Sequence, residues 1–337
     1  MKAIVYNNDE SNEVLKCEEI EKPTAGDDEV LIKVSAAALN PLDYHLLGHP
    51  FIRRMLFAKT KLKITRPGRD VAGEVEAVGS LVTKFKPGDA VFGWCGGAFA
   101  DYTCTSASAL VIKPDNVTFE QAASVPVAAI TALQGLRDKG KIQSGQKVLI
   151  NGASGGVGTF AVQIAKSFGT DVTGVCSTRN VDMVRSIGAD QVIDYTQDDF
   201  TKSEQRYDLI LDCFATHSLL ECRRILNPRG RYVGVGGPVG SMIGMLAGQI
   251  TQLALSRLVS QKFVSFMAKL NQADLGILGE LMEAGKVTPV IDRRYRLSEV
   301  PEAIRYLKEG HARGKVVITV EHASKTDNAL HPTLLSC

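Results

Sequence analysis

The chain has 337 residues, of which 45% are hydrophobic, and its 39 basic and 37 acidic side chains give a formal net charge of +2. A chain of this length and composition can bury a large core and predicts two domains. The near balance of charge excludes a global attraction to nucleic acid or to an anionic membrane, so any recognition by charge must be local.

From Met1 to about residue 120, short apolar runs alternate with turn clusters, a pattern typical of all-β structure. Runs such as VLIKVSAAAL and AGEVEAVG are separated by turn residues in KPTAGDDE and FKPGDAVFG. From about Glu120 the pattern changes to strands that alternate with helices, which is typical of parallel βαβ construction. We therefore expect a β domain followed by an α/β domain.

Six apolar runs are expected to be strands of the second domain, namely KVLING, DVTGVCS, QVIDY, YDLILDC, RYVGVGG and KFVSFMA. Helical periodicity between several of them predicts a Rossmann-type, doubly wound parallel sheet. The β pattern returns in TPVIDRRYRL and KVVITV, so the chain is expected to finish by completing the first domain. The predicted limits are 1–121 with 286–322 for the β domain, 122–285 for the Rossmann domain, and 323–337 for a loose polar tail.

The strongest chemical signal is a glycine-rich turn between a strand and a helix in VLINGASGGVGTFAVQIAKSFG, residues 148–169. Backbone amides at the start of such a helix face outward at the positive end of the helix dipole, and the missing side chains let a pyrophosphate approach. The strand and helix on either side favour this interpretation over a structural glycine turn. The predicted dinucleotide contacts are Ala153, Ser154, Gly155, Gly156, Val157 and Gly158.

The end of the next strand indicates which dinucleotide binds. An NAD site usually has an acidic residue ~20 residues after the glycines. Here the chain reads CSTRN, with Ser177 and Arg179 and no acid. A hydroxyl and a guanidinium suit a 2′-phosphate, which predicts NADPH. The alternative is that Arg179 only begins a solvated helix.

These motifs together resemble the medium-chain dehydrogenase/reductase superfamily over about residues 1–321. NPLDY at 40–44, PGRDVAGEVEAVG at 67–79, KPGDAVFG at 86–93 and GHARGKVVI at 310–318 are similar to its zinc-independent quinone oxidoreductase and enone reductase branch. The resemblance implies a GroES-like β-barrel catalytic domain beside the Rossmann domain.

The resemblance also indicates whether the chain has the ligands for a catalytic zinc ion. The positions that hold catalytic zinc in the alcohol dehydrogenases of this superfamily match Asn40, Arg69 and Val127, none of which is a normal zinc ligand. His45 and His49 have helical spacing, but Gly48 and Pro50 bracket His49, which disfavours a metal site there. We therefore expect no zinc.

Without a Lewis acid, the negative charge left by hydride addition needs another sink. A conjugated enone or a quinone delocalises that charge, and ordinary hydrogen-bond donors can complete the stabilisation. Asn40 and Tyr44 of NPLDY are the predicted catalytic donors, because the family places this segment beside the nicotinamide. The alternative for Asn40 is a structural role in the turn.

The resemblance implies further cofactor contacts. Thr131 is expected near the nicotinamide, Tyr195 near the ribose phosphate on the adenine side, and Lys315 near the phosphates. Phe214 and Val235 are expected to line the cleft at strand ends, with core packing as the alternative for both.

The substrate is expected to be a lipophilic enone or quinone, because the methionine-containing apolar region 238–266 is placed to cover the cleft. Its long apolar strand QKFVSFMAK predicts a homodimer. Polar residues within 239–259 argue against membrane insertion. Seven scattered cysteines without a C-x-x-C pair, and an N-terminus that lacks a signal-peptide pattern, predict a cytoplasmic protein.

Two other functions stay open from the sequence. One is related chemistry, as in a one-electron quinone reductase or a carbonyl reductase with a protein acid in place of zinc. The other is an NADPH-binding protein without enzymatic activity, because a fold does not determine a function.

Overall fold

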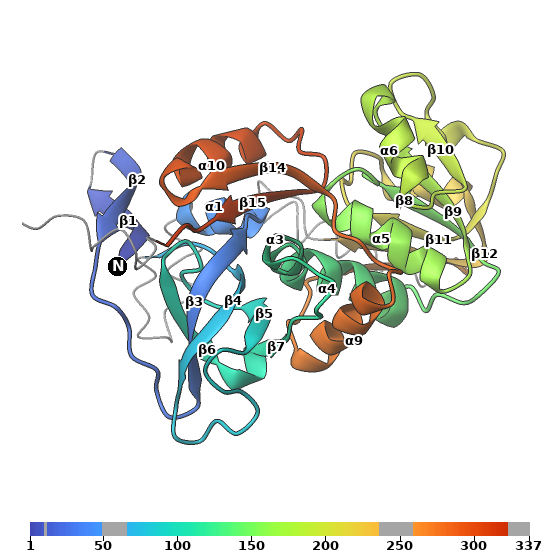
Figure 1. The fold of residues 1–337 in the computed structure, drawn as a ribbon. Coiled ribbons are helices and arrows are strands. Elements are labelled where there is room, and N and C mark those ends of the chain that lie inside the picture. Colours follow the sequence, from blue (N-terminus) through green and yellow to red (C-terminus); the bar gives the residue numbers. More distant parts are fainter. Residues whose placement is uncertain (10–11, 49–65, 236–258, 323–337) are drawn as a thin grey trace, which may run out of the picture.

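The computed structural model describes residues 1–9, 12–48, 66–235 and 259–322 (Figure 1). The described chain forms a β-rich part, which contains both β3 and β15, and an α/β part built around β8–β12. Helices α3 (Phe119–Ala123), α4 (Pro126–Gln134) and α9 (Gln272–Glu283) lie between them. This arrangement confirms the predicted fold class.

The six-stranded sheet has the order β10-β9-β8-β11-β12-β13, and every neighbouring pair is parallel. This is the strand order of a dinucleotide-binding Rossmann sheet. All six predicted strands are present, as β8 (Lys147–Asn151), β9 (Asp171–Cys176), β10 (Gln191–Asp194), β11 (Tyr207–Asp212), β12 (Leu226–Val235) and β13 (Lys262–Phe266).

Helices cover this sheet and explain its continuous apolar runs. The helices that follow the strands are α5 (Gly156–Ser167), α6 (Val181–Ser186) and α7 (Leu219–Arg224). In β8, Val148, Leu149 and Ile150 are fully buried. A strand in the middle of a parallel sheet is covered on both faces, so its residues do not alternate between apolar and polar.

The second sheet has seven strands in the order β14-β15-β3-β4-β5-β7, with β6 paired to β3. Its members are β3 (Glu29–Ala38), β4 (Asp70–Val78), β5 (Ala90–Trp94), β6 (Tyr102–Ser106), β7 (Leu110–Ile112), β14 (Ile291–Arg296) and β15 (Lys315–Thr319). A separate antiparallel hairpin joins β1 (Lys2–Asp9) to β2 (Asn12–Glu19). Strands β14 and β15 therefore return the chain to the first domain, while the residue limits of the domains stay a prediction.

Two further helices accompany this sheet, α1 (Pro41–Gly48) and α10 (Val300–Lys308). The largest core cluster joins both sheets through α4, since Ile130 and Leu133 share it with Phe92 of the seven-stranded sheet and Ile150 of the six-stranded sheet. The interface between the domains is therefore part of the hydrophobic core. Burial of this kind holds the domains together by removing apolar surface from water.

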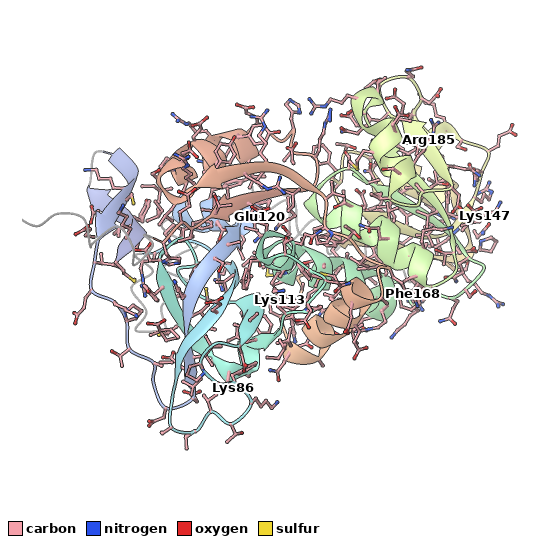
Figure 2. All side chains as sticks on the ribbon, in the orientation of Figure 1. Lys86, Lys113, Glu120, Lys147, Phe168 and Arg185 are labelled. Carbon is pink, nitrogen blue, oxygen red and sulfur yellow. The ribbon has the colours of Figure 1, made fainter. Side chains whose placement is uncertain are left out.

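Charged side chains are distributed over both ends of the molecule. Figure 2 shows Lys86 at the outer end of the β domain and Lys147 and Arg185 at the outer end of the Rossmann domain; all three are exposed. Glu120, nearer the centre of the view, accepts a hydrogen bond of 2.6 Å from Arg294. This distribution agrees with the small net charge.

Parts of three predictions lie outside the described residues: His49, most of the apolar region 238–266, and the tail 323–337. Within the described ranges, no helix has the combination of length and apolar character needed to cross a bilayer.

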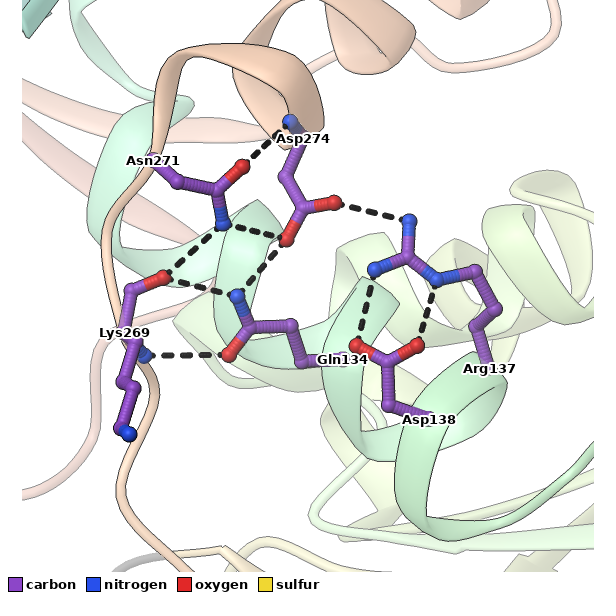
Figure 3. A network of polar contacts seen from close by, with 6 residues as sticks. All are labelled: Gln134, Arg137, Asp138, Lys269, Asn271 and Asp274. Atoms are coloured by element: carbon purple, nitrogen blue, oxygen red, sulfur yellow. Dashed lines mark hydrogen bonds and ion pairs between the residues drawn. The ribbon is translucent and has the colours of Figure 1, made fainter.

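A polar network closes the junction between α4 and α9 (Figure 3). Asp274 accepts hydrogen bonds from Gln134 at 2.7 Å and Asn271 at 2.8 Å, and pairs with Arg137 at 2.8 Å. Gln134 also donates to the Lys269 carbonyl at 2.8 Å. Burial raises the pKa of Asp274, but hydrogen bonds from Arg137, Gln134 and Asn271 outweigh it and hold that pKa below its usual value of 3.8.

We expect Asp274→Asn to lower the free energy of unfolding at pH 7 by about 1–3 kcal/mol, because it removes charged hydrogen bonds. A carboxyl whose pKa is depressed in the folded state stabilises the fold above its unfolded pKa, about 3.9. That contribution disappears as the pH falls below about 4. Urea denaturation of both proteins from pH 7 to pH 3 measures the difference, which should shrink at the acid end.

Asp182→Asn is the matched control, because the Asp182 side chain is fully exposed and lies 3.8 Å from Arg185. Its effect should stay below about 0.5 kcal/mol. An equal effect of the two substitutions would contradict a structural role for the network.

Candidate active site

Most of the predicted cofactor residues lie at one edge of the parallel sheet. The glycine turn follows β8, Ser177 and Arg179 follow β9, and Tyr195 follows β10. Phe214 comes shortly after β11, and Val235 ends β12. Because the strands are parallel and adjacent, their carboxyl ends meet at one edge, where ligands of such sheets bind (Figure 1).

The turn after β8 has the close backbone packing of an anion site. A Cβ atom on Gly158 would lie 2.0 Å from the carbonyl oxygen of Gly152, so only glycine fits there. Helix α5 begins at Gly156, and its N-cap residue Gly155 gives it no side-chain hydrogen bond. The first amides of α5 thus keep their capacity to bind a pyrophosphate, which fits a dinucleotide.

A short helical turn, Thr178–Asn180, follows β9; it contains Arg179, and Ser177 is its N-cap residue. Arg179 is exposed and donates a hydrogen bond of 3.0 Å to the His311 carbonyl. Asn180 is buried, and its Nδ2 atom contacts the hydroxyls of Ser154 at 3.1 Å and Ser177 at 3.2 Å. Asn180, which the sequence analysis missed, therefore ties the glycine turn to the end of β9.

The Oδ1 atom of Asn180 is buried and makes no hydrogen bond to the described part of the chain. A hydroxyl group of a ligand would satisfy this acceptor. This unsatisfied atom beside Ser154 and Ser177 also fits a nucleotide.

The loop after β11 presents an aromatic side chain. Asp212 is buried and accepts hydrogen bonds from the backbone amides of Phe214 at 3.0 Å and Ala215 at 2.7 Å. Phe214 is 67% exposed, so its side chain does not pack in the core. Val235, in contrast, packs partly buried against the core cluster.

A second group of residues forms a buried cluster in the β domain. The Lys315 ammonium lies 2.7 Å from Asn40 Oδ1 and 3.2 Å from Asp70 Oδ2. Asn40 Nδ2 donates to the same Asp70 oxygen at 2.8 Å. Side-chain exposure at Lys315 and Asp70 is 3% and 0%, and Asn40 is 3% exposed.

The register of the sheet brings these three residues together. Ala38 of β3 pairs with Val317 of β15 on one side and with Asp70 of β4 on the other. The residues at the same end of all three strands are therefore neighbours. Sequence analysis expected roles for Asn40 and Lys315 but missed Asp70, although Asp70 lies inside the quoted motif PGRDVAGEVEAVG.

Two backbone amides complete the cluster. Val127, in the first turn of α4, donates to Asp70 Oδ1 at 3.0 Å, and the Asn40 amide donates to Asp43 Oδ2 at 2.8 Å. Burial raises the pKa of Asp70 above its usual value, although Lys315 and hydrogen bonds act in the opposite direction. Burial raises the pKa of Asp43 to about 7.

Lys315 connects the cluster to the glycine turn. The amide of the preceding Gly314 donates to the Ser154 carbonyl at 2.8 Å. The Lys315 Cδ atom would lie 3.4 Å from a Cβ atom on Gly156. The aliphatic part of the Lys315 side chain thus lies beside the glycine turn, whereas its ammonium contacts Asn40 and Asp70.

The other two predicted residues lie on helices. Tyr44, on α1, is partly buried; burial raises the pKa of its phenol, and the Lys308 ammonium lies 5.5 Å from its ring centroid. The hydroxyl of Thr131, on α4, donates to the Val127 carbonyl at 2.6 Å. Thr131 thus contacts the residue whose amide donates to Asp70.

Metal-binding side chains do not gather in the described ranges, where no three His, Cys, Asp or Glu residues are arranged to hold an ion. His49, which has helical spacing from His45, lies outside those ranges.

Comparisons with known proteins agree with this fold. Residues 26–115 match the alcohol dehydrogenase GroES-like domain family, and residues 187–318 match the zinc-binding dehydrogenase family. The chain is 37% identical to the mitochondrial NAD(P)H oxidoreductase RTN4IP1 of Mus musculus, with 87% of this chain and 82% of the relative covered.

It is also 34% identical to the chloroplastic NADPH-dependent alkenal/one oxidoreductase of Arabidopsis thaliana, with 94% of this chain and 79% of the relative covered. Among solved structures, a quinone oxidoreductase from Coxiella burnetii is similar, with a TM-score of 0.82, 32% identity, and 95% and 99% of the two chains covered.

We expect Gly158→Ala to destabilise the protein by at least about 1–3 kcal/mol, because the added methyl group meets backbone atoms that cannot rotate away. Thermal and urea unfolding measure the loss. Gly276→Ala in α9 is the control, since a Cβ atom there meets nothing within 4 Å. That substitution should be neutral or stabilise by up to about 1 kcal/mol, because alanine favours helix. Equal stabilities for the two variants would contradict the close approach at Gly158.

Proposed function

The chain belongs to the quinone oxidoreductase and enone reductase branch of the medium-chain dehydrogenase/reductase family, and from this premise we propose that it is an NADPH-dependent oxidoreductase. The proposed reaction adds hydride to the conjugated double bond of an α,β-unsaturated carbonyl compound or to a quinone. The observation that carries this proposal is the hydrogen bond from the Lys315 ammonium to the buried amide of Asn40. The aliphatic part of Lys315 lies beside Gly156 of the glycine turn.

The residues of the sheet edge support NADPH as the cofactor, and when bound it supplies the hydride. Residues 153–158 stay the proposed pyrophosphate contacts. The amides of 156–158, in the first turn of α5, are the proposed donors, since the Ala153 and Gly155 amides already donate to the Val175 and Gly152 carbonyls. Ser177 and Arg179 would bind the 2′-phosphate. The name of the Arabidopsis relative supports the same cofactor. Thr131, Tyr195, Phe214, Val235 and Lys315 stay proposed cofactor contacts.

The cluster of Asn40, Asp70 and Lys315 suits an acceptor in which the negative charge is delocalised. Hydride addition to an enone or quinone leaves an enolate or hydroquinone anion, whose oxygen needs a hydrogen-bond donor and no Lewis acid. Asn40 is the proposed donor. Tyr44 is the second proposed catalytic donor, and its raised pKa keeps its phenol protonated at neutral pH.

We further propose that the reaction does not use zinc, although one matching family is described as zinc-binding. The side chains of Asn40, Arg69 and Val127 are not zinc ligands. The Lys315 ammonium, 2.7 Å from Asn40, would also repel a divalent cation.

Assembly and location are proposals of the same kind. Strand β13 is the last strand of its sheet and pairs only with β12 among the described strands, and such an edge can pair with a second copy. The six described cysteines are free thiols, which supports a cytoplasmic location. The mouse and Arabidopsis relatives are named mitochondrial and chloroplastic.

The proposed function is tested by NADPH consumption with a panel of enones, quinones and saturated ketones, with a chelator present throughout. We expect turnover of enones or quinones, little turnover of saturated ketones, and a reduced carbon–carbon double bond in the enone product. Activity that disappears when the chelator is added would contradict a zinc-independent reaction. NADPH binding without turnover of any acceptor would favour a binding protein.

We expect Arg179→Ala to weaken NADPH binding about ten-fold or more and to change NADH binding less than about two-fold, because only NADPH carries the 2′-phosphate. Fluorescence titration with each cofactor measures this. Arg185→Ala is the control, an exposed arginine of α6 outside the proposed phosphate site. Equal losses for NADPH and NADH would reject the 2′-phosphate assignment.

A further inference from the structure

The Asn40 side chain has one possible orientation. A lysine ammonium can only donate hydrogen bonds, so the Asn40 atom 2.7 Å from Lys315 must be the oxygen. An ionised carboxylate can only accept, so the atom 2.8 Å from Asp70 must be the nitrogen. The neighbours of Asn40 thus settle an assignment that an isolated amide leaves open.

This orientation leaves one hydrogen of the amide without a partner in the described part of the chain. The Nδ2 atom carries two hydrogens, and its one hydrogen bond to described residues goes to Asp70. Asn40 is only 3% exposed, so water reaches this donor poorly. A buried donor without a partner is costly, and the oxygen atom of an acceptor molecule would satisfy it.

The Lys315 contact strengthens the remaining donor, and the Asp70 contact sets its direction. A cation at the amide oxygen draws electron density from the nitrogen, while the hydrogen bond to Asp70 fixes the plane of the amide. Asp70 is held on its other oxygen by the Val127 amide at 3.0 Å. The ion pair balances its own charge, so the cluster can stay buried while the amide is polarised.

The chain path fixes the position of Lys315. Gly314 has φ +87°, and a Cβ atom on it would lie 2.3 Å from the Val290 carbonyl, so only glycine fits before Lys315. The Gly314 amide is bonded to Ser154 in the glycine turn. The nucleotide turn and the Asn40 amide are therefore set relative to each other by two adjacent residues.

We propose that Lys315 and Asp70 are positioning residues that orient and polarise the Asn40 amide as the hydrogen-bond donor to the oxygen of the hydride acceptor. This inference rests on the proposed function. In it, the ion pair takes the place of a Lewis acid: the hydride adds to the far carbon, the electron pair moves to oxygen, and the Asn40 N–H stabilises that oxygen until solvent protonates the product.

The test uses the double variant Lys315→Met/Asp70→Asn, because either single change leaves a buried charge without its partner. The double variant removes both charges together. We expect kcat for an enone to fall about ten- to hundred-fold. This fall should not exceed the fall in kcat that follows complete removal of an oxyanion-hole donor. Turnover of a quinone should fall less than about three-fold, because the hydroquinone anion is a much weaker base. Equal losses for both acceptors would overturn the proposal.

A double-mutant cycle with Asn40→Ala separates action through Asn40 from a general structural effect. If Lys315 and Asp70 act through Asn40, the double change should alter enone turnover less than about three-fold once Asn40 is alanine. Full additivity would overturn the proposal while leaving the proposed function intact. A wild-type protein that reduces neither acceptor overturns both.

Two further variants guard against misfolding. Lys315→Arg keeps a cation opposite Asp70 and should keep the wild-type ratio of enone to quinone turnover within about three-fold. A ratio that falls about ten-fold or more in this variant would overturn the role of charge. The matched control is Lys166→Met/Asp190→Asn, which removes a lysine–aspartate pair of 2.7 Å from the far side of the Rossmann domain. Its turnover of both acceptors should equal that of the wild type.

Discussion

The buried ion pair between Lys315 and Asp70 is the interaction on which the arrangement of the site depends. It joins two segments that are 245 residues apart and holds Asn40 between them. Removing two charges from water is expensive, so such a pair persists only where hydrogen bonds satisfy its remaining atoms. Here Asn40 and the first turn of α4 do so. Strands β4 and β15 of the seven-stranded sheet and the first turn of α4 all meet at this point.

The glycine turn supplies the second constraint, and it acts through backbone atoms alone. Gly158 lets α5 approach the Gly152 carbonyl, and Gly314 lets the returning chain pass close to the Val290 carbonyl while its amide donates to Ser154 in the glycine turn. Backbone packing of this kind sets distances more tightly than flexible side chains do. For this reason the nucleotide edge of one domain and the amide of the other keep a defined relation, which hydride transfer requires because reacting atoms must meet at short range.

The chemistry of the site follows from the kinds of group that are buried there. The family is shared with enzymes that use zinc, yet a fold does not determine a function, and the residues of the site have to be considered one by one. In this chain an amide, an ammonium and a carboxylate form the centre. Such a group can orient and stabilise an oxygen whose charge is already delocalised, and it is poorly suited to an alkoxide.

Much of the architecture was predictable because its signals are local. The six strand segments, the glycine turn and the change from β to βαβ pattern are each encoded in short stretches, and the structure confirms the fold class they predict. The sequence by itself also determined that Asn40, Arg69 and Val127 are not zinc ligands, since that depends only on residue type. It could not reveal that the Lys315 ammonium meets Asn40 and Asp70, or that Asn180 links two turns. Those contacts join residues up to 275 apart and depend on strand order and register, which only the tertiary structure decided, because no local pattern specifies which strands become neighbours.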